Sequence, residues 1–593
     1  MMIKSVRKIL VILFVISLSL CSIDAYAVEN STRENAGVKT DIKDNAVTPD
    51  TKTALDTGVA LDTGIALDAG ASLSDNATNE ETADKETADA ETADAEITAE
   101  ELVPIKSLVT DTGMFACVSN GNDTFENVAV QYVNGEDYLF LPANTNLNDL
   151  IFSYVPGIAV FIDNGEGMVF LAPNTGIDVE SFLKATKKEG VRELNLMVVL
   201  ADGRMESYKL NVLKSENIAS VFIKSEDPVA KGYKFVTEIN GNKTSGSLSV
   251  VNADGSVVYR GALNKIKGRG NSTWAANKKP FQIDLKTSTD LLQTGIEANK
   301  AKTWVLLANA FDPTLLRNSV SFDIAHSMGI DAPEYRHVDL YYDGVYLGSY
   351  LLCEKVEMGP GRVRINEKGY LLELDAAYYQ LEDNYFLDYS STPFVIKSPD
   401  KVSEAQKAYI ENMFNEAVIG ALNDGINPIT GTYVWDYIDM DSLAKYYVFQ
   451  ELTKNPDAFI SSTYFYVPEG GKIMAGPAWD FDSSYGVVKE ANMNLSSALL
   501  PKDRWIGNFL RLPEFKEAVK NFMKTTGKDA AYGEMNVLNE KAALIQSSRI
   551  MNDTLWNNCD NKYYTLPTYN RNLVYLKNFI NKRTSYLINN IGK

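Results

Sequence analysis

Short stretches of alternating apolar and polar residues, separated by turn-forming residues, fill the chain between positions 105 and 215. In VAVQYVNGEDYLFL, Asn134-Gly135 separates two such stretches, and Asp202-Gly203 separates two more near the end of the region. Alternation with a period of two is typical of β-strands, and Asn-Gly or Asp-Gly pairs favour tight hairpin turns. The pattern therefore predicts a small all-β sandwich in residues 105–215.

A different order of patterns runs through residues 218–593. Strand-like segments come first, among them KKPFQIDL and the hairpin HVDLYYDGVYLGSYLLCEKVE, which turns at Asp343-Gly344. The stretch LLRNSVSFDIAHSMG, ending at Gly329, has a helical pattern, as do SEAQKAYIENMFNEAVIGAL and SLAKYYVFQELTKN after Pro399. Strands followed by helices predict an α+β domain, and we expect two lobes with a mostly helical C-terminal lobe.

The N-terminus has the three parts of a secretory signal peptide. Basic residues precede a mostly apolar run from Ile9 to Leu20, and Ala25-Tyr26-Ala27 supplies a small-residue cleavage pattern. The run is shorter than the roughly 20 residues that a membrane-spanning helix needs. We expect residues 1–27 to be removed, leaving a secreted or cell-surface protein without a stable membrane span. Lipid attachment at Cys21 stays open.

Residues 28–104 are polar and repetitive, with copies of ALDTG followed by copies of ETAD. Such a composition buries too little apolar surface to offset the entropy lost on folding. We expect a disordered acidic low-complexity spacer. A docking tail for a basic partner is the alternative.

Composition removes several classes of function. The chain of 593 residues has 78 Asp and Glu against 57 Lys and Arg, a net charge of −21, which repels nucleic acid. Its four cysteines are widely spaced and predict neither a disulfide framework nor a zinc cluster. With only two histidines, most Ser-His-Asp, Cys-His and zinc-hydrolase mechanisms are excluded. Any catalytic chemistry must therefore use carboxylates, lysines and a bound metal.

The turn KGRGNSTW combines small residues with hydrogen-bond donors, including Arg269 and Asn271. Such a turn can approach a phosphate closely, although most glycine-rich turns are only turns. In the following strand, alternation places Lys279 on the face of Phe281 and Ile283, and Lys278 on the opposite face. A lysine on an inward face needs an anionic partner, which a nucleotide phosphate could supply. An exposed lysine at the strand end is the alternative.

Two later segments carry the acidic candidates. Asn455 and Asp457 lie in ELTKNPDAFISSTYFYV, and Asp480 and Asp482 lie in KIMAGPAWDFDSSYG. Phosphoryl transfer needs Mg²⁺, which prefers carboxylate oxygens, and a carboxylate that orients the attacking hydroxyl. The two segments supply both. A helix cap and a turn aspartate are the alternative.

Several motifs together resemble the spore coat protein H (CotH) kinase family over roughly residues 240 to 590. They are RGNSTW with KKPFQIDL, WVLLANAFDPTLLRN, YLGSYLLCEKVE, ELTKNPD and AGPAWDFDSSYG. The resemblance implies an atypical serine kinase of secreted, surface or spore-coat proteins that uses ATP with Mg²⁺ or Mn²⁺. Residues 105–215 are similar to cadherin-like or immunoglobulin-like modules, whose role would be spacing or adhesion.

The resemblance also implies roles for individual residues. Asp457 corresponds to the catalytic aspartate and Asp480 to the metal-binding aspartate, with Asp482 as a further metal candidate. Nucleotide contacts fall to four residues: Lys279, Arg269, Asn271 and Glu354, the last at a hinge that extends to Val356. Either Asp323 or Arg317 could steady the lysine or the phosphates. Ser461, Ser462 and Thr463 stand where a second-metal asparagine would be.

The chain also departs from ordinary kinases, because it has NPD and WDFD in place of the HRD and DFG sequences. A non-catalytic surface or scaffold protein with a pseudokinase-like domain therefore stays open. A metal-dependent phosphoesterase is disfavoured by the few histidines and acids available for a two-metal site. The sequence names neither the protein substrate nor the source of ATP outside the cytoplasm.

Overall fold

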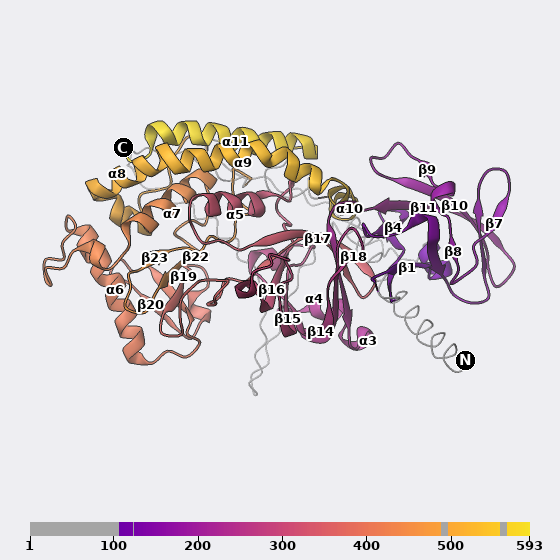
Figure 1. Ribbon diagram of the computed structural model, residues 1–593, viewed down its shortest axis with the longest axis horizontal. Helices are drawn as coiled ribbons and strands as arrows, with labels where there is room; N and C mark the ends of the chain where they lie inside the picture. The colour runs from indigo at the N-terminus through magenta and orange to yellow at the C-terminus, as the bar shows by residue number, and fades with distance from the viewer. Residues whose placement is uncertain (1–105, 122–123, 488–495, 558–565) are drawn as a thin grey trace, which may run out of the picture. The chain divides into compact units, whose positions relative to one another are not determined.

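The computed structural model describes residues 106–121, 124–487, 496–557 and 566–593 (Figure 1). The predicted signal peptide, Cys21 and the acidic spacer lie outside the described residues. Within the described part of the chain, no helix combines the length and the apolar composition that crossing a bilayer requires.

Two β-sheets form residues 106–215. The first has the strand order β2-β1-β5-β8, and the second has the order β3-β4-β11-β10-β6-β7, with β9 beside β10. Both predicted hairpins are confirmed, because Val133 pairs with Glu136 across Asn134-Gly135, and β10 pairs with β11 across Asp202-Gly203. The elements, with the short helix α2, are α2 Leu108–Thr112, β1 Phe115–Ser119, β2 Phe125–Ala129, β3 Gln131–Val133, β4 Glu136–Leu141, β5 Leu150–Ser153, β6 Ala159–Asp163, β7 Met168–Phe170, β8 Gly176–Ile177, β9 Lys184–Ala185, β10 Arg192–Val199 and β11 Met205–Lys214.

A closed barrel follows, with the strand order β12-β13-β14-β15-β16-β18-β17. The hairpin predicted at Asp343-Gly344 is confirmed, since Tyr342 pairs with Val345. Inward-facing side chains such as Ile266, Phe281 and Leu340 fill its core. The elements are β12 Ala219–Ser225, α3 Pro228–Lys231, α4 Tyr233–Glu238, β13 Lys243–Val251, β14 Val257–Gly268, β15 Phe281–Thr289, β16 Ala301–Leu307, β17 Tyr335–Tyr342 and β18 Val345–Glu354.

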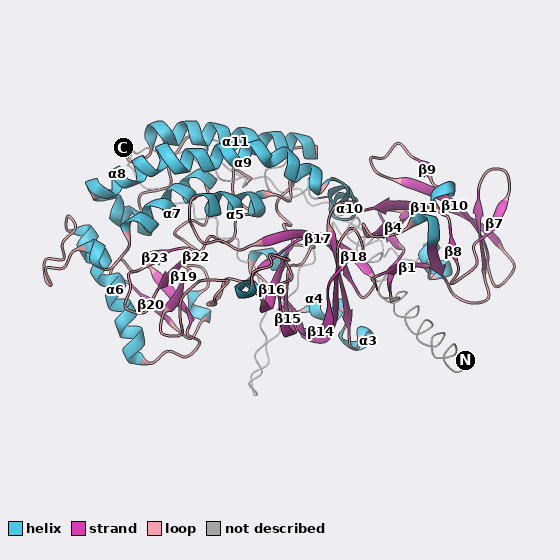
Figure 2. Ribbon diagram, viewed as in Figure 1, coloured by secondary structure: helices cyan, strands magenta, loops and turns pink. Residues whose placement is uncertain are grey.

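The rest of the chain is a five-stranded sheet, β20-β21-β19-β22-β23, with helices (Figure 2). The three predicted helices are confirmed as α5, α6 and α7. Helices α7, α9 and α11 pack together. The elements are α5 Arg317–Ser327, β19 Tyr370–Leu374, β20 Tyr385–Leu387, β21 Pro393–Ser398, α6 Glu404–Leu422, α7 Met440–Thr453, β22 Thr463–Val467, β23 Met474–Ala475, α8 Pro513–Phe522, α9 Lys528–Leu544, α10 Gln546–Trp556 and α11 Tyr569–Asn590.

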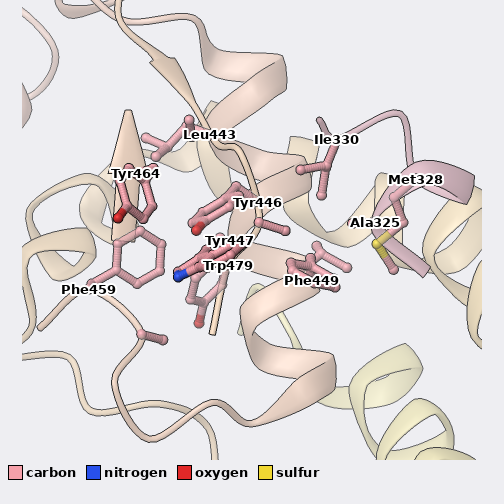
Figure 3. Packing of buried hydrophobic residues seen from close by; sticks show 14 of the residues in the cluster. Ala325, Met328, Ile330, Leu443, Tyr446, Tyr447, Phe449, Phe459, Tyr464 and Trp479 are labelled. Atoms are coloured by element: carbon pink, nitrogen blue, oxygen red, sulfur yellow. The ribbon is translucent and has the colours of Figure 1, made fainter. Parts of the chain in front are cut away.

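Aromatic side chains surround α7 and the loops that follow it. Figure 3 shows Tyr446 and Phe449 of α7 close to Phe459 and Trp479, and all four are buried. Each buried side chain of this size contributes about 1.5–3 kcal/mol to the hydrophobic stabilisation. Phe459 and Trp479 lie next to the acidic candidates in sequence, so this core fixes the two loops that carry them.

The N-terminal sheets are not packed independently of the barrel. Barrel residues Tyr341 and Tyr346 and α10 residues Met551 and Leu555 belong to the same hydrophobic cluster as the two sheets. The Gln131 side chain accepts from the Tyr346 backbone N–H at 2.9 Å and donates to the Tyr346 carbonyl at 3.2 Å. Residues 106–593 accordingly form one compact unit.

Candidate active site

Asp457 lies in a tight loop that begins where α7 ends. Lys454 adopts a left-handed conformation with a φ of 49°, which ends the helix. The backbone N–H of Asp457 then donates to Asn455 Oδ1 at 3.0 Å, and the N–H groups of Ile460 and Ser461 donate to the Asp457 carbonyl at 2.9 and 3.0 Å. These bonds hold the loop without regular secondary structure.

Asp480 follows the short strand β23, and its backbone is strained. Its φ of 65° is in the left-handed region, which costs a non-glycine residue about 1 kcal/mol and is typical of functional sites. Asn455 Nδ2 donates to the Asp480 carbonyl at 3.3 Å, and the Ser462 hydroxyl hydrogen-bonds the Asp480 carboxylate. The Asp457 loop and the Asp480 loop are therefore tied directly to each other.

Helix α5 holds the Asp480 loop through two hydrogen bonds. Asn318 Oδ1 accepts from the Phe481 backbone N–H at 2.8 Å, and Arg317 Nε donates to the Ser484 carbonyl at 3.0 Å. Arg317 is buried and paired with Asp312, which excludes the predicted contact between Arg317 and a phosphate or lysine.

Asp323, the other residue suggested for steadying the lysine or phosphates, points to a different partner. Its carboxylate accepts from the Tyr335 hydroxyl at 2.8 Å and pairs with Lys541 of α9. Its ion pair is with a lysine of the helical part and not with Lys279. The polar residues of α5 thus act as a scaffold for the neighbouring elements.

The three carboxyl groups of the site interact electrostatically. Burial, then the charge of Asp480, raises the pKa of Asp457 to about 6, and Arg504 opposes the shift. Burial also raises the pKa of Asp480, and burial together with the charge of Asp480 raises the pKa of Asp482 well above its ordinary value. A positive charge placed among these groups would lower all three values.

This donor set fits Mg²⁺ held together with a nucleotide. Among the described residues, no group of three or more His, Cys, Asp or Glu side chains is arranged to hold a metal ion. Mg²⁺ in phosphotransferases is usually bound by one or two carboxylates, with water and substrate phosphates completing its shell. Asp480 and Asp482 are the carboxylates that would hold it, since each repels the other in the absence of a cation.

The structure places Arg269 close to Asp480. Its guanidinium lies 5.3 Å from the ring of Trp479, and its charge lowers the pKa of Asp480. The loop that carries it is closed by the Arg269 N–H, which donates to the Pro280 carbonyl at 3.2 Å. Asn271 is exposed at the start of a 3₁₀ turn in the same loop.

The prediction that Lys278 faces away from the domain was wrong. Lys278, expected to face away, is only 2% exposed, and its ammonium donates to the Ser349 carbonyl at 2.5 Å and to Asn552 Oδ1 at 2.7 Å. Lys279 is half-buried, and its ammonium donates to the Trp274 carbonyl at 2.6 Å. Because β15 begins only after Pro280, the strand alternation does not extend back to the lysines.

Glu354 lines a pocket of about 170 Å³ at the end of β18. Its Oε1 lies 2.6 Å from Arg362 Nη1, and burial raises its pKa to about 7. Lys355, Val356 and Pro477 also line the pocket. Because Pro477 lies just before the WDFD sequence, the pocket adjoins the Asp480 loop, so the predicted hinge lies near the acidic residues.

Sequence reasoning missed two charged residues beside Asp457. Arg504 Nη1 donates to the carbonyl of Ala458 at 2.8 Å, and Asp375 accepts from the Ser461 hydroxyl at 3.2 Å. Both act on the pKa of Asp457, in opposite directions. Neither belongs to a motif near Asp457 in sequence, so only the tertiary structure reveals them.

Comparison with known proteins identifies the family. No curated protein matches the chain. Among solved structures, a crystal structure of a Helicobacter pylori proinflammatory kinase, CtkA, matches with a TM-score of 0.20 and 11% identity, covering 59% of this chain and 89% of that one. The family model described as CotH kinase protein matches residues 266–587, more than half of the chain. The protein therefore belongs to the CotH kinase protein family.

Proposed function

We propose that the protein is an atypical protein kinase that transfers the γ-phosphoryl group of ATP to serine hydroxyls of extracytoplasmic proteins. One observation carries the proposal: the Asp457 and Asp480 loops are tied together through Asn455, with Arg269 beside Asp480, in a chain of the CotH kinase family. In this view the barrel and the helical part are the two lobes of a kinase.

Each residue of the site has a role in this reaction. Mg²⁺, bound through Asp480 and Asp482, would neutralise phosphate charge and favour departure of the nucleoside diphosphate. Asp457 accepts a hydrogen bond from the serine hydroxyl and directs its oxygen toward the phosphorus. Arg269 and, from the same loop, Lys279 offset the remaining phosphate charge. Positioning and charge neutralisation supply most of the rate enhancement in such reactions.

The pocket beside Glu354 is the place we propose for the nucleoside end of ATP. Charged residues such as Glu354, Lys355 and Arg362 line it, and Pro477, close to Asp480 in sequence, lines it too. A base bound there would direct its phosphates toward Asp480 and Arg269. Substitution of Glu354 is then expected to weaken nucleotide binding while leaving the position of Asp457 unchanged.

The direct test is incubation of the purified mature protein with labelled ATP and Mg²⁺ or Mn²⁺. We expect label on serine in the wild-type protein and its loss in Asp457→Asn and Asp480→Asn. Asp441→Asn is the matched control, because the Asp441 side chain is 71% exposed. Label that persists in both site variants would contradict the assignment. Calorimetric absence of Mg-ATP binding would favour the scaffold alternative.

The extracytoplasmic part of the proposal rests on the signal peptide pattern. Sequencing the N-terminus of the protein recovered from the cell surface or the medium tests it. Cleavage before Val28 supports export, and an intact N-terminus found only in the cytoplasm contradicts it.

A further inference from the structure

A buried ion pair fixes the segment that leads to Arg504. Arg583 of α11 and Glu451 of α7 are both 0% exposed and pair with each other. Arg583 Nη1 donates to the Ala498 carbonyl at 2.7 Å, and Glu451 Oε1 accepts from the Leu500 N–H at 2.8 Å. Breaking a buried ion pair is strongly destabilising, so this irregular segment is held firmly in place.

Trp505 fixes the same segment on its other side. Its indole N–H donates to Asp388 at 2.8 Å, and its ring stacks on Phe459 with centroids 6.4 Å apart. Phe459 comes two residues after Asp457 in the catalytic loop. Between these anchors, the Arg504 guanidinium donates to the carbonyl of Ala458, the residue directly after Asp457, at 2.8 Å. Arg504 is thus held beside the Asp457 loop.

Arg504 also places a positive charge close to Asp457. The charges of Asp480 and Asp375 raise the pKa of Asp457. The charge of Arg504 lowers it. Arg269 acts on Asp480 instead. Among the described residues, the Ala458 carbonyl is the one hydrogen-bond acceptor found for the Arg504 side chain. A planar guanidinium with remaining donors is well suited to phosphate oxygens.

We propose that Arg504 is a catalytic residue that donates hydrogen bonds to the phosphoryl group during its transfer to the substrate serine. This inference rests on the proposed kinase function and adds a residue to it. Arg504 neutralises charge on the peripheral phosphoryl oxygens from the side where the substrate serine would bind. Arg269 does so from the side where the nucleotide would bind. The buried pair of Arg583 and Glu451 maintains this arrangement.

The step balances without any further reactant. The serine oxygen forms a bond to the γ-phosphorus, while the bond from that phosphorus to the β,γ-bridging oxygen breaks. ADP leaves with that electron pair, and the serine proton passes to the Asp457 carboxylate. Arg504 stays protonated throughout and is not consumed.

The test compares Arg504→Ala with the wild-type full-length mature protein. We expect kcat to fall about 100-fold, as when a transition-state hydrogen-bond donor is removed, with little change in the KM for ATP. Guanidinium chloride at non-denaturing concentration should restore part of the lost rate. A merely structural tether to Ala458 would give no such rescue, and that result would overturn the proposal.

A second variant and a control keep the outcome interpretable. Arg504→Lys retains a charge that can reach Ala458 but loses the planar donor pair, so we expect normal thermal unfolding with a reduced kcat. Arg511→Ala removes an exposed arginine at the end of the 3₁₀ turn Trp505–Arg511, which follows Arg504, and should not change activity. Full activity in folded Arg504→Ala would overturn this inference alone, whereas an inactive wild-type protein would overturn the kinase function as well.

Discussion

Replacing Asp457 by asparagine is expected to stabilise the folded protein while abolishing its activity. The carboxylate is mostly buried and lies near Asp480 and Asp375, and burial is the main reason that its pKa is raised. Asparagine has nearly the same shape and no charge. The variant therefore removes the unfavourable charge and leaves the packing of the loop in place.

The size of the effect follows from the pKa. A rise from the ordinary value of 3.8 to about 6 is worth about 3 kcal/mol, at about 1.4 kcal/mol for each pKa unit. The folded state binds the proton more tightly than the unfolded state. The free energy of unfolding of the wild-type protein therefore falls as the pH rises through about 6. The free energy of unfolding of Asp457→Asn does not fall in this way. The variant therefore exceeds the wild type in stability by the full amount above pH about 6 and by little near pH 4.

Urea unfolding at pH 8 and near pH 4, without metal or nucleotide, measures this difference. The exposed variant Asp441→Asn should change stability little at either pH. The electrostatic reasoning is refuted if Asp457→Asn is less stable than the wild type at pH 8, or if its advantage is the same at both pH values.

Three further predictions concern the surroundings of the site. Gly268→Ala should raise the KM for ATP, because the added Cβ would lie 2.0 Å from the Trp274 ring. Gly167→Ala is the control, since open space surrounds Gly167, and equal KM values for the two variants in kinetic assays would contradict this prediction. Asn318→Ala leaves the Phe481 N–H without its acceptor and should destabilise the protein by about 1–3 kcal/mol in urea unfolding; an unchanged midpoint would contradict this. The kcat/KM for ATP should rise between pH 5 and 7 as Asp457 of the free protein loses its proton, and a kcat/KM that is flat over this range would speak against Asp457 as proton acceptor.

Local sequence patterns predicted the elements but not all side-chain environments. The three hairpin turns and the long helices were correct because dipeptide turns and helical periodicity are short-range properties. The predicted orientation of Lys278 was wrong because Pro280 separates both lysines from β15, the strand whose alternation was used for the prediction. Its partner Asn552 comes from α10, far away in sequence, and no local pattern shows that contact.

The sequence could single out candidate site residues where a motif carries them, and their roles stay predictions. Asp457, Asp480 and Arg269 lie in segments that the sequence singled out, and in the structure Asp480 is close enough to Asp457, and Arg269 to Asp480, for each charge to act on its neighbour's pKa. Arg504 could not be found in this way, because its hydrogen bond to the Ala458 carbonyl joins segments 46 residues apart in sequence. Tertiary contacts between distant elements decide which charges reach the site.

Calorimetric titration with ATP is the most direct measurement of the central claim, that two tied acidic loops and an arginine hold the phosphates of ATP with a divalent cation. The account predicts saturable binding that requires Mg²⁺ or Mn²⁺, that is lost in Asp480→Asn and that is weakened in Arg269→Ala. Equal binding by the wild type and Asp480→Asn, or binding unaffected by a metal chelator, would contradict it.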